Sequence, residues 1–236
     1  MLNLYSFFHL NLAYSAIEEN DREKVIKSCY WPLLNLIKEN SLPFGVELSG
    51  YTLEQIYKID RDWVYLFKDL LDKNICELIG CGYSQIIGPI VPYEVNKYNL
   101  KIGNMIYEKL LNRKPKIGLF NEQTFSNGIV PIYKEAGYKI LIMEWNNPFS
   151  INNWDKEYKY YSQKINIKGN KIDLIWNQTQ LFQKFQRYVH GEIEIEDIIN
   201  YLKLQISTDQ RCLSLYGNDV EIFDFRPGRY MTEAII

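Results

Sequence analysis

The stretch Lys116-Ile117-Gly118-Leu119-Phe120-Asn121-Glu122 is a short apolar run that leads directly into a carboxylate. A run of this length between polar residues predicts a buried strand, and Glu122 then stands where that strand ends. Comparable runs recur along the whole chain, so the sequence predicts seven strands. They lie at residues 4–12, 44–48, 75–81, 117–120, 140–143, 172–176 and 212–215.

Amphipathic stretches separate most of these runs and predict helices. Residues 21–38 place Val25, Cys29 and Leu33 on one face, and Thr52 with Gln55 forms a capping box that opens a second helix running on to residue 71. Continuous apolar strands that alternate with helices indicate a parallel sheet covered by helices. Seven such repeats favour a single α/β domain over residues 1–236, a seven-stranded parallel (β/α)7 barrel, with residues 146–164 as a long excursion.

Composition excludes several classes of partner. The 27 basic and 29 acidic side chains give no strong field, so we expect neither nucleic acid nor a membrane as a partner, and a neutral substrate fits better. The four cysteines lack CxxC spacing, and the apolar start lacks the basic region of a signal peptide. With no apolar stretch of about 20 residues, the protein is expected to be cytoplasmic. Aromatic residues reach 15%, and such faces can stack on sugars as well as fill a core.

Polar side chains stand at or just after the ends of the predicted strands. In a parallel α/β fold these ends meet at one rim, where ligands bind. We therefore expect the candidate site residues to gather there, with Glu122 and Asp219 as the catalytic candidates and the others as substrate-binding candidates. The set is His9, Asn11, Glu47, Gln85, Glu122, Trp145, Asp219 and Glu221.

Glu122 and Asp219 are the two carboxylates whose position best suits catalysis, because each follows a strand directly. Two such groups at one rim form the nucleophile and acid/base pair that cleaves glycosidic bonds. From the residues alone, Glu122 could equally cap a helix or form an ion pair, and Asp219 could be a turn residue beside Gly217 and Asn218.

Metal chemistry finds little support in the sequence. The chain has only two histidines, His9 and His190, far apart and without the spacing of a zinc site. No acidic cluster has the spacing of a calcium loop. We therefore expect no metal and no cofactor.

Two stretches resemble motifs of glycoside hydrolase family 57. The residues 118–122, followed by Gly128-Ile129 and Glu135-Ala136-Gly137-Tyr138, are similar to the region of the family's nucleophile. Asp219-Val220-Glu221-Ile222-Phe223 resembles the family motif whose first Asp is the acid/base. The resemblance thus implies that Glu122 is the nucleophile and that Asp219 is the acid/base.

Three further segments fall in the family's order, so the resemblance spans almost the whole chain. They are His9-Leu10-Asn11, Glu47-Leu48-Ser49-Gly50, and Gly80-Cys81-Gly82-Tyr83-Ser84-Gln85 with Pro89. The Gln and Pro of the first motif are absent, Gln85 replaces the usual histidine of the second, and Asp224 replaces the glycine that closes the last. These departures imply that the substrate could differ from the starch-like α-glucans typical of the family.

The resemblance implies a seven-stranded (β/α) barrel and a retaining glycoside hydrolase or transglycosidase that acts on α-linked oligo- or polysaccharide by double displacement. In the family a helical segment normally follows the barrel, and we expect residues 1–236 to lack it. Two alternatives remain: a non-catalytic glycan-binding barrel and a metal-dependent polysaccharide deacetylase on a related barrel. The sequence leaves the sugar, the linkage, the acceptor and the oligomeric state open.

Overall fold

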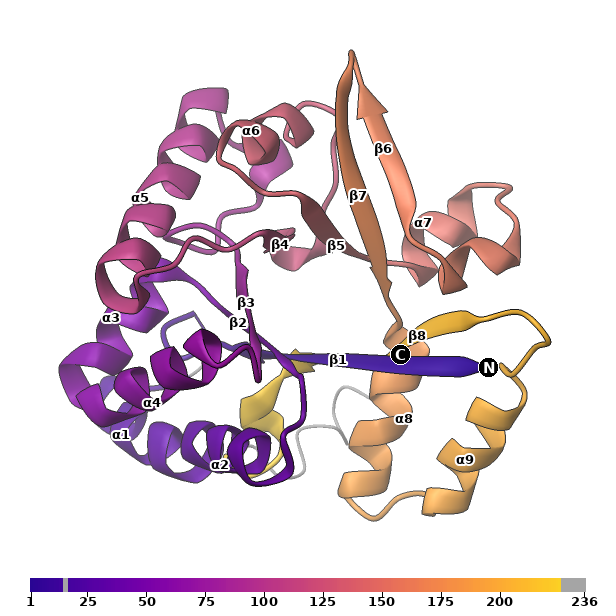
Figure 1. Ribbon diagram of the computed structural model, residues 1–236, viewed down its shortest axis with the longest axis horizontal. Coiled ribbons are helices and arrows are strands. Elements are labelled where there is room, and N and C mark those ends of the chain that lie inside the picture. Colours follow the sequence, from indigo (N-terminus) through magenta and orange to yellow (C-terminus); the bar gives the residue numbers. More distant parts are fainter. Residues whose placement is uncertain (15–16, 226–236) are drawn as a thin grey trace.

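The computed structural model describes residues 1–14 and 17–225 and shows an α/β fold (Figure 1). The strands are β1 (Leu2–Leu10), β2 (Gly45–Leu48), β3 (Glu77–Gly80), β4 (Ile117–Leu119), β5 (Ile140–Glu144), β6 (Gln163–Ile167), β7 (Asn170–Asn177) and β8 (Arg211–Asp219). The helices are α1 (Arg22–Val25), α2 (Trp31–Asn40), α3 (Gly50–Ile59), α4 (Arg61–Asp72), α5 (Tyr93–Leu111), α6 (Val130–Glu135), α7 (Asn146–Ile151), α8 (Thr179–Val189) and α9 (Ile195–Lys203). A π-helical turn, Ile26–Tyr30, joins α1 to α2.

The strands form one mixed sheet in the order β6-β7-β5-β4-β3-β2-β1-β8. Every neighbouring pair from β7 to β8 is parallel, whereas β6 pairs antiparallel with β7. The α/β class and the parallel order of the seven predicted strands are confirmed. The described residues contain eight strands rather than seven. The extra strand is β6, which begins at the end of the expected excursion, residues 146–164, and pairs with β7 as a hairpin.

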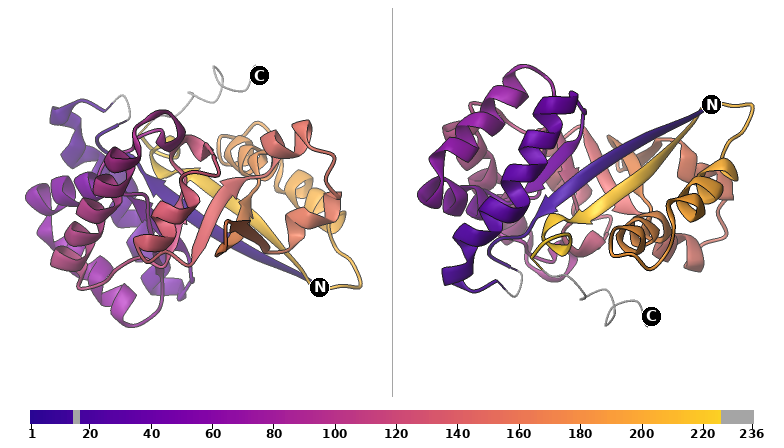
Figure 2. Two further views of the ribbon diagram at one scale, coloured as in Figure 1. Left: turned by 90° about the horizontal axis from the view of Figure 1, so that it is seen from above. Right: turned by 90° about the horizontal axis from the view of Figure 1, so that it is seen from below.

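Helices cover the outer face of the sheet. In Figure 1, α1 to α5 lie beside β1, β2 and β3, while α8 and α9 lie beside β8. The largest core cluster fills the first of these interfaces and includes the fully buried Tyr30, Trp63 and Phe67. A smaller cluster joins the inward side chains Phe7 of β1, Ile79 of β3, Leu119 of β4 and Ile142 of β5. Because β1, β3, β4 and β5 all contribute to this cluster, the sheet curves around it and its concave face is packed. Figure 2 shows the molecule from above and below, with β1 and β8 side by side in the right-hand view.

Two helix boundaries differ from the prediction. Ser49, not Thr52, caps α3: the Thr52 backbone N–H donates to the Ser49 Oγ at 3.1 Å. The expected long second helix is two helices, because Asp60 ends α3 and its side chain accepts from the Trp63 N–H at 3.1 Å to start α4. A serine and an aspartate that bond the backbone locally favour these starts over continuous helix.

Strands β7 and β8 approach each other at their carboxyl ends through a side chain. The Asn177 amide donates to the Gly217 carbonyl at 2.7 Å, and Ser214 Oγ lies 3.2 Å from Asn177 Oδ1. A Cβ at Gly217 would lie 2.2 Å from Asn177 Oδ1 and 2.6 Å from the Phe7 ring. Glycine is therefore the residue that allows this approach, two positions before Asp219.

Candidate active site

His9 is the centre of a polar network on the concave side of the sheet. Its Nδ1 bonds the carboxylate of Glu47, which is fully buried at the end of β2. Its Nε2 lies 2.9 Å from the side-chain amide nitrogen of Gln85. A carboxylate only accepts, so the ring proton belongs on Nδ1, and Nε2 then accepts from the Gln85 amide. Both ring nitrogens are thereby occupied and the ring is fixed in one orientation.

The charges of Asp219 and Glu122 both affect the pKa of His9. Asp219 Oδ1 lies 3.9 Å from His9 Nε2, at the end of β8, which pairs directly with β1. Burial lowers the pKa of His9, and the negative charges of Asp219 and Glu122 partly oppose that shift. The rim thus brings two of the predicted residues, Asp219 and Glu122, within electrostatic range of a third, His9.

Glu122 stands on a short turn, Asn121–Gln123, that follows β4. Its backbone is left-handed, with φ 51° and ψ 20°, and Gln123 follows with φ 52°. Such a conformation costs a non-glycine residue roughly 1–2 kcal/mol. The buried Asn121 holds the turn, because its side-chain amide donates to the carbonyls of Cys81 and Ile86, each at 3.2 Å. The Glu122 side chain is exposed at the rim.

Glu221 is completely buried behind the rim, where its Oε1 accepts from the Asn11 backbone N–H at 2.7 Å and from the Tyr30 hydroxyl. Its Oε2 has no partner among the described residues. Burial first, and then the charge of Asp219, raise the pKa of Glu221 to about 7. The fully buried Glu221 is therefore placed to hold the Asn11 backbone rather than to contact a sugar, whereas a sugar contact through the Asn11 side chain stays a prediction.

Trp145 lies in an aromatic cluster rather than at an open surface. Its side chain is 3% exposed and its ring stacks on Phe149, with centroids 4.9 Å apart. The neighbouring Glu144 accepts from the backbone N–H groups of Asn146 and Asn147 at 2.6 and 2.7 Å, so that it caps the start of α7. The burial of Trp145 leaves it no free face for the substrate stacking expected from the sequence.

Two contributors to the site were not identified from the sequence. Tyr30 lies on the apolar face of a helical segment, where nothing in the sequence distinguishes it from a core aromatic residue. Asn121 directly precedes Glu122, and the preference of asparagine for tight turns was a signal that could have found it.

Known proteins resemble this chain in sequence and in fold. The model of glycosyl hydrolase family 57 matches residues 5–235. "Alpha-amylase 1" of Dictyoglomus thermophilum is 24% identical over 213 residues, which cover 89% of this chain and 30% of the relative. The crystal structure of a 4-alpha-glucanotransferase from Thermococcus litoralis superposes with a TM-score of 0.80 at 19% identity, covering 98% of this chain and 35% of that one. A putative polysaccharide deacetylase from Mycobacterium smegmatis shares the fold at TM-score 0.63 and 11% identity, covering 99% and 82% of the two chains.

The fold and the rim together define an α/β protein with carboxylates at the carboxyl ends of parallel strands. The family match covers nearly the whole sequence, and the chain belongs to glycosyl hydrolase family 57. It spans about a third of the length of the amylase relative and of the glucanotransferase. Among the described residues, no helix is long and apolar enough to cross a membrane, and no group of three or more His, Cys, Asp or Glu side chains has the arrangement of a metal site.

Proposed function

We propose that this chain is the catalytic barrel of a retaining glycosidase or transglycosidase, with Glu122 as nucleophile and Asp219 as acid/base. The observation that carries the proposal is the position of His9, which contacts Asp219 at 3.9 Å and whose pKa is affected by the charges of both carboxylates. Glycosidases of this kind need two carboxyl groups on either side of one sugar bond. The Glu122 and Asp219 carboxyl groups are expected to lie about 5–7 Å apart.

The reaction would proceed in two displacements. A Glu122 oxygen attacks the anomeric carbon, the bond to the leaving oxygen breaks, and Asp219 gives its proton to that oxygen. The carboxylate of Asp219 then removes a proton from water or from an acceptor sugar hydroxyl, whose oxygen displaces Glu122. Two inversions at the same carbon leave its configuration unchanged.

His9 and Glu47 have a positioning role in this scheme. Their bond, with the Gln85 amide on the far ring nitrogen, holds a neutral imidazole beside Asp219. A neutral ring, unlike an imidazolium, places no positive charge next to the Asp219 carboxyl group. This suits a group that must deliver a proton in the first step.

The proposed substrate class is an α-linked glucan. The near-balanced charge of the chain favours a neutral substrate, and the relatives carry the names alpha-amylase and 4-alpha-glucanotransferase. We further infer that the parallel strands form a (β/α)7 barrel, whose seam is the bridge from Asn177 to Gly217. The deacetylase alternative rests on likeness of fold alone.

Covalent trapping tests the proposal. A 5-fluoro-α-glucosyl fluoride forms the glycosyl–enzyme but releases it slowly, and peptide mapping by mass spectrometry should find the sugar on Glu122. A label on a different carboxylate would reassign the nucleophile, and protein that remains unlabelled at saturating reagent would contradict a retaining mechanism. Anomeric NMR of the first product from an oligosaccharide should show retention.

A further inference from the structure

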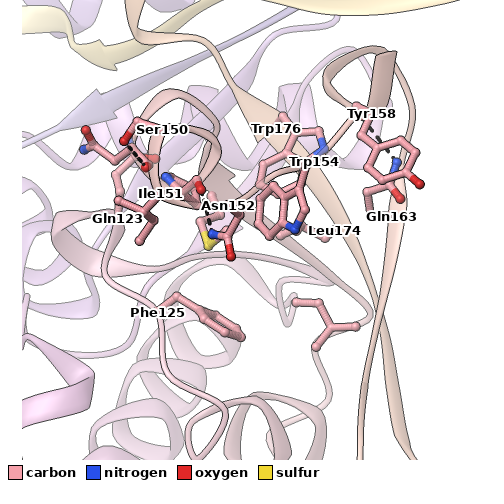
Figure 3. Close-up of a pocket in the computed structure, with 14 residues that line it drawn as sticks. Gln123, Phe125, Ser150, Ile151, Asn152, Trp154, Tyr158, Gln163, Leu174 and Trp176 are labelled. Atoms are coloured by element: carbon pink, nitrogen blue, oxygen red, sulfur yellow. Dashed lines mark hydrogen bonds between the residues drawn. The ribbon is translucent and has the colours of Figure 1, made fainter. Parts of the chain in front are cut away.

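A pocket of about 770 Å³ lies beside the rim, on the outer face of β5 and β7 (Figure 3). The β6–β7 hairpin, α7 and the residues after the Glu122 turn surround it. Its volume lies in the range of small-molecule sites, roughly 300–1,000 Å³. The residues that matter for its chemistry are Gln123, Phe125, Asn152, Trp154, Gln163 and Trp176.

Aromatic rings form the apolar wall of the pocket. Trp154 and Trp176 lie with ring centroids 5.8 Å apart and planes inclined at 46°, and Figure 3 shows them side by side. Phe125 lines the pocket from the segment after the Glu122 turn, and its side chain is 39% exposed. Trp154 and Phe125 are partly open to solvent, so their rings offer the apolar C–H faces of a sugar a flat surface on which to stack.

The polar part of the lining consists of amides and hydroxyls. None of the fourteen described lining residues carries a charge at neutral pH. Two buried polar atoms of the lining have no partner among the described residues: the indole Nε1 of Trp176 is a donor and the Oε1 of Gln123 is an acceptor. Buried polar groups are normally hydrogen-bonded, so these two atoms indicate a ligand with both donors and acceptors. Hydroxyl groups supply both, whereas an apolar side chain of a partner protein supplies neither.

The pocket adjoins the proposed nucleophile through the chain itself. Gln123 lines the pocket and directly follows Glu122 in the same left-handed turn. Phe125 comes two residues later. A substrate whose reacting sugar lies at Glu122 can therefore extend along this segment towards the pocket.

We propose that this pocket binds a segment of the α-glucan chain beyond the bond that is cleaved, with Trp154 and Phe125 as stacking faces and Trp176 and Gln123 as hydrogen-bond partners. The proposal rests on the proposed function for the identity of the sugar. It adds a second place at which the substrate is held, away from the two carboxylates.

Titration with maltohexaose tests this binding. In the Glu122→Gln variant, which prevents turnover, the indole N–H signals of Trp154 and Trp176 in ¹H–¹⁵N spectra should shift on addition of the sugar. Trp154→Ala in the same background should weaken binding about tenfold or more, which corresponds to about 1.4 kcal/mol. Phe125→Ala removes a partly exposed ring with less risk to folding, and should weaken binding several-fold.

Tyr98→Ala is the matched control, because Tyr98 is an exposed aromatic residue on α5, outside the pocket lining, and its loss should leave affinity unchanged. Unmoved indole signals at saturating maltohexaose would overturn the proposal, as would unchanged affinity in both pocket variants or no binding at all. Failure of the proposed function is seen separately, since covalent trapping at Glu122 does not depend on the pocket. If Glu122 is labelled but the indole N–H signals do not shift, the proposed mechanism stands and the proposed sugar binding in the pocket is wrong.

Discussion

The two sides of the rim differ in how far their carboxylates are buried, because Glu47 and Glu221 are fully buried whereas Glu122 is exposed. Both sides hold buried polar atoms without described partners, among them oxygens of Asn11, Glu47 and Glu221. On the side of β1, β2 and β8, His9 is bonded at both ring nitrogens and Glu221 accepts two hydrogen bonds at one oxygen. On the side of β4, β5 and β7, Glu122 is exposed on a left-handed turn, and the adjoining pocket holds two buried polar atoms without described partners. The first side thus holds its carboxylates within the protein around a fixed His9 ring, whereas the second leaves its carboxylate open to a ligand.

This difference suggests that the two sides have different roles in the proposed reaction. A proton donor needs a fixed environment, because its acidity depends on every neighbouring charge and hydrogen bond. A nucleophile and the groups that hold the sugar need access. Substitutions on the two sides should therefore affect different measured quantities.

Glu122→Gln should have the largest effect, because the amide cannot form the glycosyl ester. We expect turnover of an α-linked oligosaccharide to fall at least about a thousandfold, while the thermal unfolding temperature changes little because the side chain is exposed. Glu94→Gln, an exposed glutamate at the start of α5, is the control and should keep wild-type turnover. Near wild-type turnover in Glu122→Gln would show that Glu122 is not the nucleophile.

Asp219→Asn should lower turnover of natural oligosaccharides by about 10²–10⁴-fold, the usual contribution of a general acid or base. Substrates with a good leaving group, such as an aryl glycoside, should retain formation of the glycosyl–enzyme. Azide should then accelerate the second step, because it attacks without needing a base. Equal losses on both substrate types, with no response to azide, would contradict the acid/base role.

Glu221→Gln should change how stability depends on pH. The folded pKa of Glu221 is raised from 4.5 to about 7, so its contribution is fully present below pH 4.5 and is lost as the pH rises through 7. The loss is on the order of 3 kcal/mol. The lowered pKa of His9 acts in the opposite sense, with stability lost as the pH falls below about 6.5.

The Gln variant isolates the contribution of Glu221, because the amide oxygen can keep the bonds from Asn11 and Tyr30. Urea unfolding at pH 5, 6, 7 and 8 should show a flatter profile for the variant than for the wild type. Parallel profiles would mean that Glu221 titrates at its ordinary pKa, and the network behind Asp219 would be less buried than the structure indicates.

At pH 6.5, where an ordinary imidazole is half protonated, His9 should be mostly neutral, because burial lowers its pKa. Long-range ¹H–¹⁵N correlation spectra should show one protonated nitrogen, Nδ1, facing Glu47, and one unprotonated nitrogen facing Gln85. Replacing Gln85 by Ala should shift the Nε2 resonance more than that of Nδ1. A ring that is mostly doubly protonated at pH 6.5 would contradict both the lowered pKa and the single fixed orientation of the ring.

Removal of metal ions by a chelator should not change the activity or the stability of the protein. Dialysis against EDTA should leave both turnover and unfolding temperature unchanged, as the sequence leads us to expect. A loss of activity that zinc or calcium restores would favour the deacetylase class.

Much of the fold could be predicted because apolar runs at strand length are local signals. All seven parallel strands appear at or near the predicted runs, and the candidate residues were chosen from their positions at or just after those runs. The hairpin strand β6 was missed because Gln163–Ile167 alternates polar and apolar residues and pairs only with β7. Its apolar residues could not be assigned to a face without knowledge of that pairing.

The roles of the site residues were harder to predict than their positions. Glu221 and Trp145 stand just after strands, as Glu122 does, yet both are buried. Burial depends on which helices pack behind the strand, here the segment with Tyr30 for Glu221 and α7 for Trp145. The left-handed turn at Glu122 was also unforeseen, since it is imposed by the bonds of Asn121 to distant carbonyls.

That left-handed turn has a consequence for protein engineering. Glycine or asparagine at position 122 would lower the energetic cost of the left-handed backbone that glutamate now adopts there. Directed evolution that selects for heat resistance alone would therefore favour these replacements. Such variants would gain stability and lose the proposed nucleophile. Libraries built on this chain should therefore keep position 122 fixed, or alternate each round of thermal selection with a screen for sugar release.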